Sequence, residues 1–134
     1  MKIRYYRKHP LLRVLTQKQV ARFEKRGMVG LAQFWADSVC GIHATHVAIC
    51  LDQKQIIGFF RFTIAGRTLR AAGTWVDPRH RHRGLAKALW TTTLKRYRPE
   101  IVSVITISRG GTKLIRSLIK ADGLGLITWL HNAT

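Results

Sequence analysis

Three strand-like runs follow one another between residues 46 and 76, with very short turns between them. They are HVAICL at 46–51, IIGFFRFTI at 56–64 and TLRAAGTWV at 68–76, separated by DQKQ and AGR. Runs that are rich in β-branched and aromatic residues and joined by tight turns are typical of antiparallel strands. We therefore expect an antiparallel meander of these three strands.

The hydrophobic period changes after residue 84, where the spacing predicts a helix that ends before Pro99, because proline cannot continue a helix. The inward-facing positions of this helix are expected to be Leu85, Ala88, Leu89, Thr92 and Leu94. The β-branched run EIVSVITIS at 100–108 then predicts a buried strand. A helix over 109–123 and a last strand over 124–132 are expected to follow.

The N-terminal part adds an edge strand and two helices. KIRYYRK at 2–8 predicts the strand, which Pro10 ends, and helices are expected at 17–27, after an N-cap at Thr16, and at 31–39. The expected order is β-α-α-β-β-β-α-β-α-β. A chain of 134 residues can form one domain with a real core but not two. We expect one α/β (α+β) domain over residues 1–134, with a mixed, mostly antiparallel sheet.

Charge is the feature of the composition that bears most on function. The chain has 24 Lys and Arg against 6 Asp and Glu, a net charge of +18. An enzyme for a small neutral metabolite gains nothing from such a charge, because self-repulsion destabilises the compact state. A polyanionic partner, DNA or tRNA, accounts for it better.

Other compositional features set the remaining expectations. No apolar run approaches the roughly 18 residues that cross a bilayer, so we expect no membrane span. The two cysteines, Cys40 and Cys50, are expected to be free thiols in a reducing cytoplasm. No cluster of His, Cys or acidic residues has the spacing of a metal site, and no metal is expected.

The stretch DPRHRHRGLA at 77–86 is the strongest local motif. It follows a predicted strand and leads into the helix that starts near Gly84, so unpaired backbone N–H groups and the helix dipole favour an anion there. Gly84 permits close approach of a phosphate, and Arg81 and Arg83 add charged donors. The position alone predicts a phosphate-binding loop.

The same stretch resembles the acyl-CoA-binding motif of the GNAT N-acetyltransferase superfamily, Arg/Gln-x-x-Gly-x-Gly/Ala. Here the motif is Arg81-His82-Arg83-Gly84-Leu85-Ala86, preceded by Val76-x-Pro78. The order of predicted elements is also similar to the GNAT order over nearly the whole chain. The resemblance implies a GNAT fold and an acetyl-CoA or other acyl-CoA donor. It places the pyrophosphate on the N–H groups of residues 82–86 and the pantetheine arm along Trp75 and Val76.

The next family motif is present only in part. Where many GNAT enzymes have Asn and, later, the Tyr that protonates the leaving thiolate, this chain has Thr112 and Ile119. Thr112 is taken as a cofactor-binding position, but Ile119 cannot donate a proton. The general acid is therefore a different residue or water, the chemistry differs from ordinary acetyl transfer, or the domain only binds.

No acid occupies the strand position that often supplies the family's general base. Because strands two to four are antiparallel, the start of strand two lies beside the start of strand four, at the end that faces the acceptor in the family. His43 and His46 come near this end, and a neutral imidazole is a suitable base for an amine. Asp37 is the candidate that would orient either histidine. Asp77, in the turn, is expected to be structural.

Two clusters of tyrosine and basic residues are the candidates for nucleic-acid contact, because tyrosine among guanidiniums can stack on an unpaired base. One is at the N-terminus and one is near the end of the helix that precedes Pro99. Their members are Arg4, Tyr5, Tyr6, Arg7 and Lys8, and then Lys95, Arg96 and Arg98 around Tyr97. The other reading of each cluster is a solvated surface.

Three functions remain open. The first is an acyltransferase-type enzyme that modifies an amino group on a nucleic acid, similar either to Mom-type enzymes of phages that modify DNA adenine or to toxins that acetylate aminoacyl-tRNA. The second is a protein N-acetyltransferase that acts on a host factor. The third is a non-catalytic nucleic-acid-binding module with a GNAT fold. The oligomeric state stays open as well.

Overall fold

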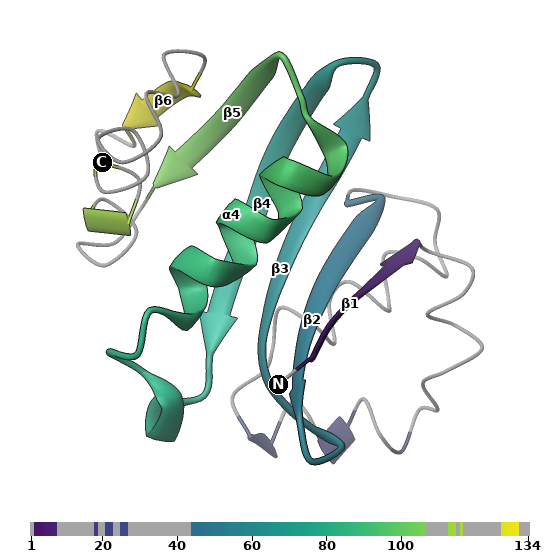
Figure 1. Cartoon of the computed structure of the whole chain (residues 1–134), viewed down its shortest axis with the longest axis vertical. Helices are drawn as coiled ribbons and strands as arrows, with labels where there is room; N and C mark the ends of the chain where they lie inside the picture. Colours follow the sequence, from purple (N-terminus) through teal and green to yellow (C-terminus); the bar gives the residue numbers. More distant parts are fainter. Residues whose placement is uncertain are drawn as a thin grey trace.

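The computed structural model describes residues 2–7, 18, 21–22, 25–26, 44–106, 113–114, 116 and 127–131. Its elements are the strands and helices β1 (Lys2–Arg7), β2 (His46–Asp52), β3 (Gln55–Ala65), β4 (Thr68–Val76), η1 (Pro78–His80), α4 (Leu85–Tyr97), β5 (Ile101–Thr106) and β6 (Ile127–His131). All the strands that the sequence predicts are present, and Figure 1 shows their arrangement.

One six-stranded sheet has the order β1-β2-β3-β4-β5-β6. The pairs from β1 to β4 are antiparallel, whereas β4–β5 and β5–β6 are parallel. The expected meander and the mixed, mostly antiparallel sheet are thus confirmed. Most of the three other predicted helices lies outside the described residues. Of their positions, the structure shows 18, 21, 22 and 25 and then 113, 114 and 116 as helical.

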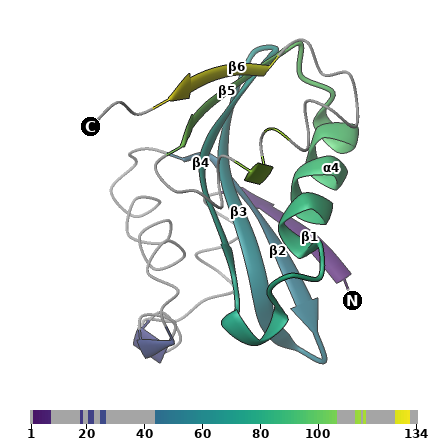
Figure 2. The same ribbon diagram turned by 90° about the vertical axis from the view of Figure 1, so that its left-hand side faces the viewer.

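The helix α4 covers one face of the sheet (Figure 2). Trp90 of α4 stacks on Phe60 of β3 with ring centroids 4.4 Å apart, and its Nε1 donates to Thr74 Oγ1 of β4 at 2.9 Å. Gly58 of β3 is required by this close packing. A Cβ there would lie 3.1 Å from the Trp75 carbonyl oxygen and 3.4 Å from Leu85 and Leu89.

The buried face of α4 differs from the prediction at one position. Thr93 is fully buried, and Thr92, which was expected to face inward, is exposed. Thr93 tolerates this place because its hydroxyl donates to the Leu89 carbonyl at 2.6 Å, which satisfies the buried polar group. The prediction for Thr92 was therefore wrong by one residue.

The opposite face of the sheet is buried too. Strand alternation places Val47, Ile49 and Phe59 away from α4, and all three are at most 3% exposed. Phe59 stacks on Trp75 of β4 at 5.7 Å. Phe59, Phe60, Phe62 and Trp90 are buried core residues, whereas the side chains of Phe34, Trp35 and Trp129 lie outside the described part.

The strand β5 is buried only at alternate residues. Val102 and Val104 belong to the core beneath α4, while Ile101 at the start of the strand is 47% exposed. Pairing between β4 and β5 is short. The described register joins Thr68–Arg70 to Ile101–Ser103, after which the two strands diverge (Figure 1). We call this diverging region the β4–β5 split.

Candidate functional site

The loop between β4 and α4, residues 77–84, lies where the last central strand ends and the helix begins (Figure 1). Asp77 shapes its first part. Its backbone N–H bonds to the Ile57 carbonyl of β3 at 2.8 Å, and its Oδ1 accepts from the backbone N–H of Arg79 at 3.0 Å. That backbone bond and the Arg79 guanidinium outweigh burial and hold the pKa of Asp77 below its usual range, so the side chain is a carboxylate at neutral pH.

The second part of the loop turns through two residues in the left-handed region, His82 at φ 64° and Gly84 at φ 74°. Gly84 is the N-cap of α4, and no heavy atom of the described residues lies within 4 Å of a Cβ built on it. The described part of the chain therefore leaves the space beside Gly84 open. His82 has a conformation that is uncommon for residues other than glycine, although histidine adopts it more readily than most.

The N-terminus of α4 carries backbone donors without side-chain caps. Gly84 has no side chain to cap the helix, and the first intrahelical bond runs from Ala88 N to the Gly84 carbonyl at 2.9 Å. The N–H groups of the first turn are thus available to an anion, which the helix dipole favours as well.

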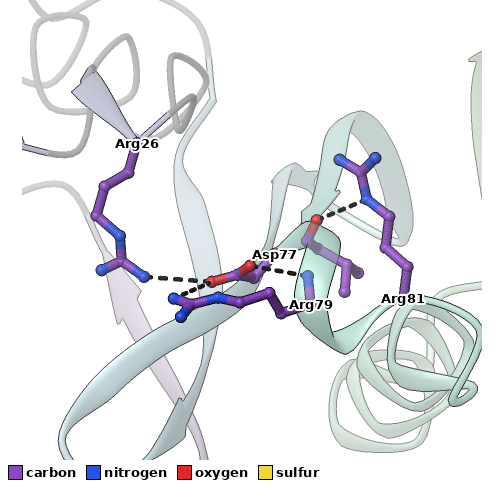
Figure 3. Close-up of polar contacts among 5 residues, drawn as sticks. Arg26, Asp77, Arg79 and Arg81 are labelled. Carbon is purple, nitrogen blue, oxygen red and sulfur yellow. Dashed lines mark hydrogen bonds and ion pairs between the residues drawn. The ribbon is translucent and has the colours of Figure 1, made fainter.

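The predicted cofactor positions of the loop surround this opening. Arg81, His82, Arg83 and Gly84 are exposed, whereas the side chain of Leu85 points into the core and Ala86 is half-buried. Arg81 is fixed by a bond from its Nε to the carbonyl oxygen of Val76 at 3.0 Å, which ties the loop to the end of β4 (Figure 3). Thr112 lies outside the described residues.

The predicted path for the pantetheine arm is the edge of β4. Trp75 and Val76 lie in the part of β4 beyond its described pairing with β5, so this edge faces the β4–β5 split. A register shift opposite Arg61 and Phe62 leaves Ala72 unpaired on the β3 side, which is a β-bulge. The strand therefore presents an open edge from its bulge to the phosphate loop.

Of the candidate bases, the structure describes His46, while His43 and Asp37 lie outside the described residues. His46 begins β2, opposite Phe62 of β3, which in turn pairs with Ala71 of β4. The expectation that the starts of β2 and β4 lie at the same end of the sheet is confirmed. The Nδ1 atom of His46 is 2.6 Å from Thr45 Oγ1. Burial, and then Arg7, lowers the pKa of His46, so the ring is neutral at pH 7.

Residues from the two tyrosine-containing clusters contact one another. The guanidinium carbon of Arg96 lies 4.5 Å from the ring centroid of Tyr5, and the Tyr5 and Tyr97 rings meet edge to face at 5.8 Å. His46 contacts Tyr97 and stacks on Phe62. Positions 5 and 96 are far apart in the sequence, and the sequence carries no signal that would have joined them.

Strand alternation divides the N-terminal cluster. Ile3 and Tyr5 pack against the core beneath α4, and Arg7 shares their side of β1, whereas Arg4 and Tyr6 lie on the other side. Lys8 is outside the described residues. Four of the exposed cations of the described residues near the C-terminal end of α4 are Arg7, Lys95, Arg96 and Arg98, and we call these four the α4 C-terminal rim.

Across the described ranges, no group of three or more His, Cys, Asp or Glu side chains could hold a metal ion. In the same part of the chain no helix is long and apolar enough to cross a membrane.

One known protein family matches most of the chain. The model of the acetyltransferase (GNAT) family matches residues 15–108, more than half of the chain. The match ends before position 119, where the sequence departs from the motif of that family. A search of curated protein sequences finds no match.

Solved structures with the same fold include several acetyltransferases. A GNAT-family acetyltransferase from Streptococcus pneumoniae is 15% identical, with a TM-score of 0.61, over 99% of this chain and 98% of that one. An N-acetyltransferase from E. coli bound to coenzyme A is 13% identical, with a TM-score of 0.61, over 93% and 91%. A ribosomal-protein-alanine N-acetyltransferase from Brucella melitensis is 16% identical, with a TM-score of 0.57, over 87% and 89%.

Proposed function

Because this chain belongs to the GNAT acetyltransferase family, we propose that it transfers an acyl group from acyl-CoA to an amino group carried by a nucleic acid. The observation that carries the donor half of the proposal is the open anion site at the start of α4. The observation that carries the acceptor half is the net charge of +18, together with the α4 C-terminal rim.

The residues of the loop fit the phosphates of coenzyme A. The N–H groups of residues 82–86 would bind the pyrophosphate, and Gly84 leaves room because nothing lies within 4 Å of its Cβ position. Arg81, held through its Nε, and Arg83 would add charged donors. Trp75 and Val76 would line the pantetheine arm with their backbone, and Thr112 is the further cofactor position that the family resemblance suggests.

Acyl-CoA supplies the acyl group as a thioester, and the chain supplies its orientation. A donor with its phosphates at the start of α4 and its arm along β4 extends toward the bulge at Ala72. α4 has 13 residues and is therefore about 20 Å long, and the phosphate loop and the rim lie at its two ends. A donor arm that follows β4 from the loop to the bulge would therefore bring the acyl group closer to the rim.

The rim suits an acceptor with a phosphate backbone. Its four cations are exposed and can neutralise phosphates with release of counterions. Arg96 is supported by Tyr5 and Tyr97, whose rings are occupied by contacts within the protein. We therefore assign these two tyrosines to holding Arg96 and leave base stacking to Tyr6, beside Arg4 on the other side of β1.

Proton transfer involves His46 in this proposal. As a neutral imidazole it can accept the proton of the acceptor amine. Two strand spacings, together about 10 Å, separate His46 from Ala71, so the proton of an amine at the bulge would reach His46 through a chain of water molecules. His43 and Asp37 remain the other candidates, and water is the proton source for the departing thiolate in place of the tyrosine that Ile119 replaces.

Mass spectrometry of nucleosides and proteins from cells that express the chain tests the proposal. A mass increase on a nucleoside of DNA or tRNA, or on the aminoacyl group of tRNA, is expected with the wild type. It should disappear with Gly84→Glu, which places bulk and negative charge in the anion site. An acyl group found only on protein would mean that the acceptor is a protein and not a nucleic acid. No modification at all would mean that the chain is a binding module without catalytic activity.

Gly66→Glu is the matched control. Gly66 lies in the β3–β4 turn at φ 60°, and its Cβ position is as open as that of Gly84. The two substitutions impose the same charge and a similar backbone strain. Coenzyme A binding, measured by calorimetry on the purified proteins, should therefore be lost in Gly84→Glu and retained in Gly66→Glu.

A further inference from the structure

Asp77 is an acidic residue beside the proposed anion site, where a negative charge is unfavourable for anion binding. It is the only acidic residue between Asp52 and Glu100, and arginines or histidines occupy positions 79–83. Its side chain is 7% exposed. A carboxylate next to an anion site repels the anion, so its presence there needs another reason.

The contacts of Asp77 supply that reason. Its Oδ2 lies 3.3 Å from Nη2 of Arg26 and 3.7 Å from Nη2 of Arg79, while its Oδ1 accepts the Arg79 N–H (Figure 3). Its own N–H is bonded to Ile57 of β3. One buried side chain thus joins the end of the sheet, the start of the loop and a residue 51 positions earlier in the chain.

Arg26 reaches Asp77 from the N-terminal part. Its backbone N–H bonds to the Arg22 carbonyl at 3.1 Å, which is helical spacing. In Figure 2 the described pieces of this segment lie on the side of the sheet away from α4, level with the β4–α4 loop. The Arg26–Asp77 pair therefore braces the phosphate loop from the far side of the sheet.

We propose that Asp77 and Arg26 are positioning residues for the donor: their ion pair holds the loop in the shape that binds the phosphates of coenzyme A. The inference rests on the proposed function. Neither residue touches the donor in this assignment. Asp77 fixes the backbone of residues 77–80, and Arg26 fixes Asp77, so the donors at 82–86 stay aimed at one point.

Asp77→Asn gives a test in which two explanations predict opposite signs. The amide keeps an oxygen for the Arg79 N–H but loses the charge that holds Arg26. Electrostatics alone predicts tighter binding of coenzyme A, because one negative charge near the phosphates is removed. The positioning role predicts weaker binding, by about 3-fold to 10-fold, the range set by loss of one partly exposed ion pair.

The probe is coenzyme A itself, titrated calorimetrically into the full chain at constant ionic strength. Arg26→Gln should weaken binding, though no more than Asp77→Asn, which also loses the Arg79 guanidinium. The double variant should be no weaker than Asp77→Asn alone, because the Arg26 contact is already absent there. Arg26→Lys, which keeps the charge, should recover part of the affinity. With an acyl-CoA substrate the loss should be in KM for the donor rather than in kcat.

Glu100→Gln is the matched control. It also removes one negative charge, but Glu100 is exposed and pairs with Arg67 at 2.6 Å at the other end of α4. Its affinity for coenzyme A should equal that of the wild type. If Asp77→Asn proves unfolded by circular dichroism, Arg26→Gln decides, since Arg26 is 36% exposed and its loss leaves a smaller defect.

Two results would overturn the inference. One is a folded Asp77→Asn or Arg26→Gln protein that binds coenzyme A as tightly as the wild type or more tightly. The other is a double variant whose loss equals the sum of the single losses. A wild type that does not bind coenzyme A would instead refute the donor half of the proposed function, on which this inference depends.

Discussion

Replacing Lys95 and Arg98 together by glutamine should reduce the salt dependence of nucleic-acid binding. Both side chains are exposed members of the α4 C-terminal rim, and neither takes part in the contacts of Arg96 with Tyr5 and Tyr97. The double variant should therefore fold like the wild type, with an unchanged melting temperature, while the rim loses half of its four charges.

The expected magnitude follows from the number of phosphates that the rim can neutralise. Each phosphate contact with duplex DNA contributes about −0.9 to the slope of log K against log salt, so a rim of four cations contributes about −3.6. Between 50 and 200 mM salt this corresponds to about a 150-fold loss of affinity. The double variant should reduce the magnitude of the slope by about 1.8. The two remaining rim cations should then account for about a 12-fold loss of affinity between 50 and 200 mM salt.

Fluorescence anisotropy with one labelled duplex at several salt concentrations measures these slopes. The matched control is Lys2→Gln with Lys54→Gln. Both are exposed lysines, and they lie at the start of β1 and in the β2–β3 turn, away from the rim. Equal slopes for the two double variants would refute the reasoning, because the charge would then act as a diffuse field and not through the rim.

Three further substitutions test the packing and the titration of the fold. Gly58→Ala should lower the free energy of unfolding by about 1–3 kcal/mol in urea denaturation, because its Cβ would lie 3.1 Å from the Trp75 carbonyl oxygen. An unchanged midpoint would show that the Trp75 carbonyl oxygen and the side chains of α4 leave room for a methyl group. Trp90→Phe should cost about 1 kcal/mol in the same measurement by removing the bond to Thr74 Oγ1, and Thr74→Val in the Trp90→Phe background should then add little. Burial lowers the pKa of His46 below its ordinary value of 6.5, so the imidazole binds a proton more readily in the unfolded chain than in the folded one. The contribution of His46 to stability is therefore complete above pH 6.5 and is lost as the pH falls through the lowered pKa. His46→Phe should show a smaller fall in stability between pH 7.5 and pH 5, and an identical fall would assign the pH dependence to other groups.

The sequence predicts the parts of this fold that local patterns determine. The meander follows from alternation and short turns, and the phosphate loop follows from a glycine between a strand and a helix. Near Thr92 and Thr93 the pattern was insufficient, because two adjacent threonines have the same polarity and only a bond to the Leu89 carbonyl makes one of them a core residue. Ile101 was expected in a buried strand, but it lies at the strand's first position, where its side chain remains 47% exposed.

The contacts that the sequence could not predict are those between distant segments. Nothing local in RYYRK indicates that Tyr5 will support Arg96, and nothing near Asp77 indicates Arg26 as its partner. Each contact depends on the register of β1 or on where an N-terminal segment lies against the sheet. The lone acid in a basic loop was nevertheless a usable signal, because a buried carboxylate needs a cation or several donors.

The short pairing between β4 and β5 affects how the sequence of such a chain can evolve. Three register pairs connect the antiparallel half of the sheet to β5 and β6, whereas the donor loop and α4 rest on β3 and β4. Substitutions in β5 that keep these three pairs and the burial of Val102 and Val104 can thus accumulate with little effect on the loop before α4. Selection can therefore alter this edge of the sheet while the loop before α4 is inherited unaltered.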